Sequence, residues 1–362
     1  MCANTLSKLS GLRTTVAPDC EILHERIRRW TNIDRKIPTA TILPRSEEDC
    51  LKTVKIRVQW VLQLSIPFEP TCGGHSAWST IGEEGIIIDM SHYADVHVEA
   101  DSKTATLASG ILSKQVGVRL AEAGLFTALG NGNTVGAIPY SLGGGASITS
   151  TIAGFGSDQI VSARVIITKD GGRLVEVAEK EHPDLLWALR GAGQFFGLVT
   201  QLTIRAHPFS LLRKQQGLYP PPYAGPGGMM MIVAPPPTRT PSLVIAARYT
   251  GDEYPEVLFK PLNDLHPLVT TGRDVPIQNF SDAREVLCAK GDFKQFGVVG
   301  LHDFDAEGFL QTIDTWKKLV HDCRDAINTG FHFQWDSRPI KTPDIESVTS
   351  LHGIRYWQYN LV

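Results

Sequence analysis

The sequence predicts an α+β protein made of two domains. Its 362 residues exceed the size at which a single hydrophobic core stops growing, so two domains are expected. Helical and strand-like patterns alternate along the chain, and segments 95–99 and 104–108 alternate between apolar and polar residues as half-buried strands do. A stretch rich in proline and glycine, 219–228, is the natural linker between the domains.

The first half reads as a mixed α/β unit that ends near Phe209. The clearest helix covers 46–64, where acidic residues follow Ser46 and apolar residues then recur at helical spacing. Gly124 is expected to close a second helix as its C-terminal cap. We expect helices at 21–30, 46–64, 111–124 and 182–190, and strands at 85–89, 95–99, 104–108, 160–168, 174–177 and 195–206.

The second half predicts an α+β domain in which strands and helices alternate. Strands are expected at 243–249, 297–301 and 330–335, and helices at 254–265 and 306–326. Met229, Met230 and Met231 read as apolar filling, and Trp187 and Leu189 read as core residues.

Composition excludes several classes of protein. A net charge of -3 with no block of lysine or arginine argues against a nucleic-acid partner, and no apolar run is long enough for a membrane span. The first residues lack the hydrophobic stretch of a secretory signal, so a cytoplasmic location is expected. Six scattered cysteines favour reduced thiols over a disulfide framework or a zinc site, and no metal is expected.

Glycine is concentrated between Gly130 and Gly156, where it accounts for 8 of 27 residues, against 33 of 362 in the whole chain. This enrichment indicates backbone that packs closely or adopts unusual dihedral angles. It is not the dinucleotide fingerprint, because Val135 stands where the third glycine would be needed. The motifs of P-loop proteins, zinc metalloproteases and α/β-hydrolases are also absent from the sequence.

Another glycine cluster, Gly73-Gly74-His75-Ser76, lies before this segment and is the first of the two in the chain. The glycine-rich segment itself contains Thr134-Val135-Gly136 and the second cluster, Leu142-Gly143-Gly144-Gly145. Loops of this kind can form backbone nests that hold a pyrophosphate without a basic side chain. The alternative is a pair of tight turns. Two clusters together favour contact with a ligand.

These motifs carry a resemblance. Cys72-Gly73-Gly74-His75-Ser76 resembles the R-x-G-G-H-S loop of the berberine-bridge-enzyme-like FAD-linked oxidases, and the likeness continues in order through 134–136, 142–145, 156–160, 184–193 and 196–200. The resemblance implies a PCMH-type FAD-binding domain of two α/β subdomains, followed by a substrate domain with an antiparallel sheet and helices. We expect a helical lead-in at 1–36, the FAD-binding domain at 37–210 and the substrate domain at 211–362.

The family carries its flavin on the histidine that matches His75, bonded through the C8α methyl group. The alternative is a loop histidine that only forms hydrogen bonds, with FAD held noncovalently. The resemblance places Asp158 near the adenosine half and the backbone of Ile160 against adenine, although a turn-capping aspartate and a plain strand residue are the alternatives. The expected cofactor-binding residues are Cys72, Gly73, Gly74, His75, Ser76, Val135, Gly136, Gly144, Gly145, Asp158 and Ile160.

Three departures from the family pattern stand out. Thr71-Cys72 replaces the arginine ahead of the glycines, so the charge of that arginine is missing from the loop. Gly132 occupies the place of the cysteine that forms a second flavin bond in many members, which predicts a single attachment. The chain ends at Val362, where members usually continue into a berberine-like segment, so a truncated substrate domain is expected.

The resemblance implies an FAD-dependent oxidase of a small organic molecule in secondary metabolism. The substrate would pass a hydride to the flavin, and O2 would reoxidise it. No catalytic base can be assigned from the sequence. A flavin-scaffolded cyclase without redox turnover, or a truncated and catalytically weak FAD-binding protein, is the alternative.

Overall fold

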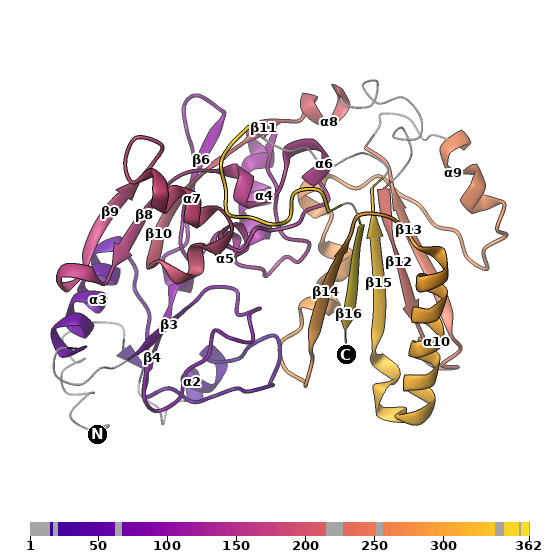
Figure 1. Cartoon of the computed structure of the whole chain (residues 1–362), viewed down its shortest axis with the longest axis horizontal. Helices are drawn as coiled ribbons and strands as arrows, with labels where there is room; N and C mark the ends of the chain where they lie inside the picture. The colour runs from indigo at the N-terminus through magenta and orange to yellow at the C-terminus, as the bar shows by residue number, and fades with distance from the viewer. Residues whose placement is uncertain are drawn as a thin grey trace. The chain divides into compact units, whose positions relative to one another are not determined.

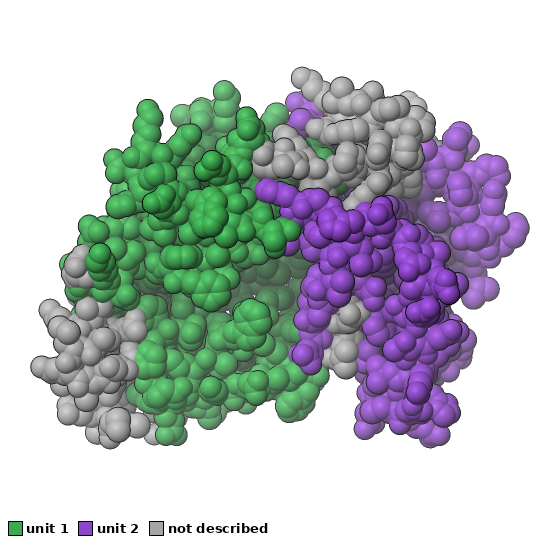
Figure 2. Space-filling view, viewed as in Figure 1, with its two compact units in different colours: residues 1–208, 275–293, 343–350 green, residues 209–274, 294–342, 351–362 purple. Residues whose placement is uncertain are grey.

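The computed structural model describes residues 15–16, 21–61, 67–214, 227–250, 256–336, 344–354 and 356–361. The chain forms two compact units (Figure 2). Unit 1 contains residues 1–208, 275–293 and 343–350, and unit 2 contains residues 209–274, 294–342 and 351–362. Two segments from the second half of the chain therefore fold with the first half. The expected division into domains at 1–36, 37–210 and 211–362 stays a prediction.

Unit 1 contains a four-stranded sheet in the order β1-β2-β4-β3, in which β2 and β3 run parallel to the central β4 and β1 runs antiparallel to β2. All four residues of β4 are buried, as expected for a parallel strand with both faces covered. The elements are β1 (Thr15–Val16), α2 (Glu21–Arg26), β2 (Ala40–Ile42), α3 (Glu47–Val61), β3 (Phe68–Thr71), β4 (Ile86–Asp89) and η1 (Met90–His92).

A five-stranded antiparallel sheet in the order β5-β6-β10-β8-β9 forms the second half of unit 1 (Figure 1). Its buried side chains pack with those of α4, α5 and α7 in one continuous core. Val54 of α3 joins Ile88 and Ile166 in a second core that links the two sheets. The elements are β5 (Val96–Val98), β6 (Thr104–Ala108), α4 (Ser113–Glu122), α5 (Ala137–Leu142), β8 (Ile160–Ile167), β9 (Arg173–Val177), α7 (Pro183–Ala192) and β10 (Leu198–Arg205).

Shorter elements complete unit 1, and several lie in the glycine-rich segment. They are β7 (Leu125–Phe126), which pairs with β11 (His207–Pro208), α6 (Ser150–Ala153), η2 (Ser157–Gln159), η3 (Lys169–Gly171), η4 (Gly193–Phe195), η6 (Ile277–Asn279) and η7 (Asp282–Cys288).

Unit 2 is built on a five-stranded antiparallel sheet in the order β13-β12-β15-β16-β14 (Figure 1). The fully buried Trp316 of α10 packs with Ile232 and Phe331 and fixes that helix to one face of the sheet. The elements are α8 (Ser210–Lys214), β12 (Gly227–Val233), β13 (Ser242–Arg248), α9 (Glu256–Asn263), β14 (Phe296–Leu301), α10 (Ala306–Asp322), η8 (Arg324–Asn328), β15 (Gly330–Trp335) and β16 (Tyr356–Leu361).

The α+β prediction is confirmed, and most expected elements are present within a few residues of their predicted bounds. Gly124 has a φ angle of 71° directly after the C-cap of α4, as a glycine C-terminal cap requires. The methionine run forms part of β12, a strand bonded on both sides, and Met229 is buried there as the prediction of apolar filling implies. The prediction that Trp187 is a core residue is wrong, because 44% of its surface is exposed on α7. Residues 219–226 of the expected linker lie outside the described residues.

Among the described helices, none combines the length and the apolar character that crossing a lipid bilayer would require.

Candidate functional site

The loop after β3 packs directly against the loop that precedes α5. A Cβ atom on Gly73 would overlap the carbonyl oxygen of Thr134 and lie 2.7 Å from the nitrogen of Gly136. Both neighbours are backbone atoms, so only glycine allows this approach. Gly74 has a φ angle of 71°, and its carbonyl accepts a hydrogen bond of 2.9 Å from the N–H of Trp30. The two predicted motifs therefore form one structure.

His75 is held against the same second loop. Its Nε2 lies 2.8 Å from the hydroxyl oxygen of Thr134, and the two side chains share a hydrogen bond. The carbonyl of Val135 accepts from the N–H of Ser113 at 2.8 Å, which fixes this loop to the start of α4. The sequence analysis assigned no role to Thr134. Its hydroxyl is the only polar side-chain group in the motif Thr134-Val135-Gly136. Ser76 is exposed, and its hydroxyl accepts from the N–H of Trp78 at 3.2 Å.

Cys72 has a packing role in this arrangement. Its Sγ lies 3.5 Å from the carbonyl oxygen of Ile111, and a Cβ on Gly136 would come within 2.8 Å of that sulfur. Burial raises the pKa of the Cys72 thiol to about 12. A thiol that stays protonated is a poor nucleophile, so the residue serves as a small, partly buried packing side chain.

The backbone of the second glycine cluster forms hydrogen bonds with residues that follow it in the chain. Gly144 and Gly145 have φ angles of 100° and 73°, which favour glycine. Their carbonyl oxygens accept hydrogen bonds of 2.7 Å from Ser157 N–H and 2.8 Å from Gly156 N–H. A Cβ on Gly145 would come within 2.7 Å of the Tyr140 ring, so the ring fills the space that a side chain would take.

Asp158 and Ile160 follow this cluster, and their polar groups form hydrogen bonds with other residues of unit 1. The buried carboxylate of Asp158 accepts a hydrogen bond of 2.8 Å from the N–H of Phe155, which closes the turn between them. The carbonyl oxygen of Ile160 accepts from the Arg190 guanidinium, at 3.2 Å from Nε and 3.0 Å from Nη2. The turn-capping alternative therefore describes the contact of the Asp158 carboxylate.

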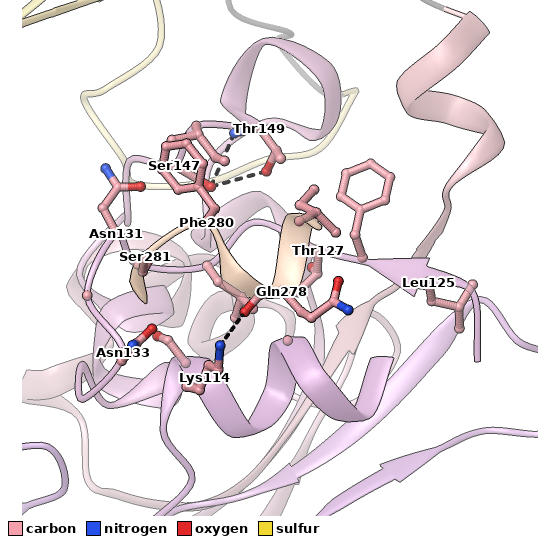
Figure 3. A pocket seen from close by; sticks show the side chains of 18 residues that line it. Lys114, Leu125, Thr127, Asn131, Asn133, Ser147, Thr149, Gln278, Phe280 and Ser281 are labelled. Carbon is pink, nitrogen blue, oxygen red and sulfur yellow. Dashed lines mark hydrogen bonds between the residues drawn. The ribbon is translucent and has the colours of Figure 1, made fainter. Parts of the chain in front are cut away.

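A small pocket that is partly open to solvent borders the loop 130–133 (Figure 3). Lys114 anchors one wall, because its ammonium group donates to the carbonyl of Gln278 at 3.0 Å and to Asn279 Oδ1 at 2.8 Å. No motif marked this pocket, because its lining comes from distant segments. The lining residues include Leu125, Phe126, Thr127, Leu129, Asn131, Asn133, Ser147, Thr149, Phe280 and Ser281.

The residues of this region fit a phosphate-containing cofactor. Gly74 has a positive φ angle, and glycine turns of this kind can form backbone nests that bind anions. The hydroxyl oxygen of Ser157 is completely buried and has no hydrogen-bond partner within the described part of the chain. An orphaned buried hydroxyl next to a glycine turn is the kind of group that a bound cofactor would satisfy.

Comparisons with known proteins agree with this fit. Residues 38–178 match the family model described as an FAD binding domain. The chain is 31% identical to the FAD-linked oxidoreductase hasG of Aspergillus fumigatus, and the alignment covers 98% of this chain and 81% of that protein.

Solved structures show the same fold. A xylooligosaccharide oxidase from Myceliophthora thermophila matches with a TM-score of 0.78 at 16% identity, covering 100% of this chain and 83% of that one. Glucooligosaccharide oxidase from Acremonium strictum matches with a TM-score of 0.76 at 16% identity, covering 100% and 82%. That enzyme is described as holding a 6-S-cysteinyl, 8α-N1-histidyl FAD. The α+β fold is the PCMH-type fold of these oxidases, and the chain belongs to the family of FAD-linked oxidoreductases, with FAD as its cofactor.

Proposed function

We propose that the chain is an oxidase that carries FAD on His75 and uses it to oxidise a small organic molecule in secondary metabolism, with O2 as the final electron acceptor. The observation that carries the proposal is the contact of the His75 loop with the loop of Thr134, which unites two motifs 59 residues apart. FAD supplies the two-electron chemistry when bound, and the protein binds and orients it.

The tether is proposed to form through Nδ1 of His75, because Nε2 shares a hydrogen bond with Thr134. Forming the C–N bond would require the C8α methyl group to give up one hydrogen and the imidazole nitrogen its proton, and O2 would take up the two electrons and two protons as hydrogen peroxide. Thr134 would hold the imidazole in one orientation and so favour one nitrogen over the other.

The remaining proposed contacts are made mainly by backbone. Gly73, Gly74, Val135 and Gly136 form one group, and Ser76 and Cys72 flank the first loop. Gly144, Gly145, Asp158 and Ile160 form a second group, whose backbone we propose to lie along the adenosine half. Gly132 has no side chain from which a second bond could form, so single attachment remains the proposal.

Acid precipitation of the purified protein tests the tether. Flavin should stay with the precipitated wild-type chain, and peptide mass mapping should find it on the peptide that contains His75. His75→Ala should release its flavin into the acid supernatant, whereas His97→Ala, which changes an exposed histidine, should behave as the wild type. Flavin that is fully acid-extractable from the wild type contradicts the tether.

Reoxidation tests the oxidase assignment without knowledge of the substrate. The flavin is photoreduced without oxygen and then mixed with air-saturated buffer while its absorbance is followed. An oxidase should recover its oxidised spectrum within seconds and form hydrogen peroxide in equal amount. Recovery over many minutes would point instead to a dehydrogenase or to a flavin without redox turnover.

A further inference from the structure

Basic side chains gather around Gly74, although the motif itself contains none. A Cβ on Gly74 would lie 3.3 Å from the Nζ atom of Lys290 and 3.5 Å from the Cδ atom of Arg29. Arg29 follows α2, and Lys290 belongs to the segment 275–293 that folds into unit 1. The Lys290 ammonium and the aliphatic part of the Arg29 side chain therefore lie beside the first glycine loop, although they come from distant parts of the sequence.

Arg29 is 2% exposed and only partly satisfied. Its Nε donates to the carbonyl of Ser79 at 2.7 Å, and its Nη1 donates to the carbonyl of Arg26 at 3.3 Å. Its Nη2 is buried and has no hydrogen-bond partner among the described residues. Burial lowers the pKa of the guanidinium, and the charge of Asp89 opposes that shift. A buried charged donor without an acceptor is costly, so its retention calls for a ligand.

Lys290 is held beside Arg29 by the backbone. The N–H of Gly291 donates to the carbonyl of Arg29 at 3.0 Å, and Arg28 Nη2 donates to the carbonyl of Lys290 at 3.2 Å. Within the described ranges, the Lys290 ammonium makes neither a hydrogen bond nor an ion pair. Loss of water around the ammonium and then repulsion by Arg29 lower the pKa of Lys290, whereas Asp89 raises it.

Asp89 does not neutralise these cations. One of its oxygens accepts from the N–H of Ser91 at 3.0 Å, and the other lies 3.7 Å from Nη1 of a further arginine, Arg26. Around the glycine loop, positive charge therefore exceeds negative charge. Nearby cations repel each other, and a bound anion would relieve that repulsion.

We infer that Arg29 and Lys290 complete an anion site with the backbone of Gly73 and Gly74, and that its occupant is the pyrophosphate of FAD. The two side chains supply from elsewhere the charge that the loop lost when Thr71-Cys72 replaced the family's arginine. A lysine and an arginine suit this ligand, because both donate charge-assisted hydrogen bonds to phosphate oxygens. The inference rests on FAD as the cofactor and is independent of the tether at His75.

The test uses His75→Ala as background, so that flavin can be exchanged and its dissociation constant measured by fluorescence. Lys290→Met is the informative change, because Lys290 is exposed and its loss should not unfold the chain. Loss of one charge-assisted bond should weaken FAD binding about tenfold. Lys290→Arg should restore the affinity, and Lys180→Met, which removes a distant exposed lysine, should leave it unchanged.

Two further measurements separate phosphate recognition from a general structural effect. Riboflavin, which lacks phosphate, should bind the Lys290→Met variant as tightly as it binds the parent His75→Ala protein. Inorganic pyrophosphate should displace FAD from the parent more readily than from the variant. Arg29→Lys should retain FAD and Arg29→Met should lose it, provided that the melting temperature shows a folded protein.

An FAD affinity for Lys290→Met that matches the parent at low and at physiological salt overturns the inference. Equal losses of FAD and riboflavin affinity also overturn it, because they would place the effect on the ring rather than the phosphates. A wild type whose flavin exchanges freely would refute the tether alone and leave this comparison intact.

Discussion

The two glycine clusters of unit 1 look alike in sequence and serve different purposes in the structure. At Gly73, the missing side chain lets two backbone segments touch, and His75 forms a hydrogen bond with Thr134 beside them; the side chains of Lys290 and Arg29 lie beside the neighbouring Gly74. At Gly145, the missing side chain makes room for the ring of Tyr140. The first cluster leaves charge unsatisfied, and the second closes on itself.

The difference teaches that glycine content alone does not identify a ligand site. What distinguishes the first cluster is the set of groups around it, which come from segments as distant as Lys290. The following substitutions test the distinction, from the largest expected effect to the smallest.

Gly73→Ala should have the largest effect. The added methyl group would overlap the Thr134 carbonyl and approach the Gly136 nitrogen, and neither backbone atom can move without displacing its loop. We expect a loss of about 3 kcal/mol in the free energy of unfolding, measured by denaturant titration. Flavin should also be lost from the protein that remains folded. Gly272→Ala, at a glycine with open space around it, is the control. A fully flavinylated Gly73→Ala protein would refute this account of the first loop.

Gly145→Ala should cost less stability than Gly73→Ala. A left-handed backbone costs an alanine about 1–2 kcal/mol, and contact with the Tyr140 ring should add to it. Gly124→Ala has nearly the same φ angle, 71°, and open space, so the difference between the two variants isolates the contact. Because Gly145 is proposed to contact the cofactor through its backbone, the flavin content of the folded protein should fall less than in Gly73→Ala. A folded Gly145→Ala protein without flavin would show that the second cluster also depends on its side-chain space for the cofactor.

Thr134→Val should have the smallest effect. It keeps the shape of the side chain and removes the hydroxyl that bonds His75, which should cost about 1 kcal/mol of stability. Covalent attachment should become slower, because the imidazole is no longer held in one orientation; a time course of acid-stable flavin measures this. Thr312→Val, which removes a hydroxyl bonded to its own helix, is the control. An unchanged attachment rate would remove Thr134 from the proposed machinery.

Local patterns predicted much of the fold. The periodic apolar residues of α3 and the alternation in β6 are properties of short segments, and both elements are present where expected. β12 was missed because three methionines with two preceding glycines carry no strand signal, and only pairing with β13 and β15 makes them a strand. α5 and α6 were missed because glycine enrichment hid two short helices.

By itself, the sequence predicted the family, the cofactor and the loop of His75, because the ordered glycine motifs carry the resemblance to the family. Only the tertiary structure decided what surrounds that loop. Thr134 stands in a motif, but the contact of its hydroxyl with His75 follows from a distance that folding creates, and Arg29 and Lys290 belong to no motif. A loop whose backbone must pack closely needs glycines at fixed positions, and these can be recognised in the sequence. Side chains that converge from distant segments form no such pattern, since many segments could supply the same charge.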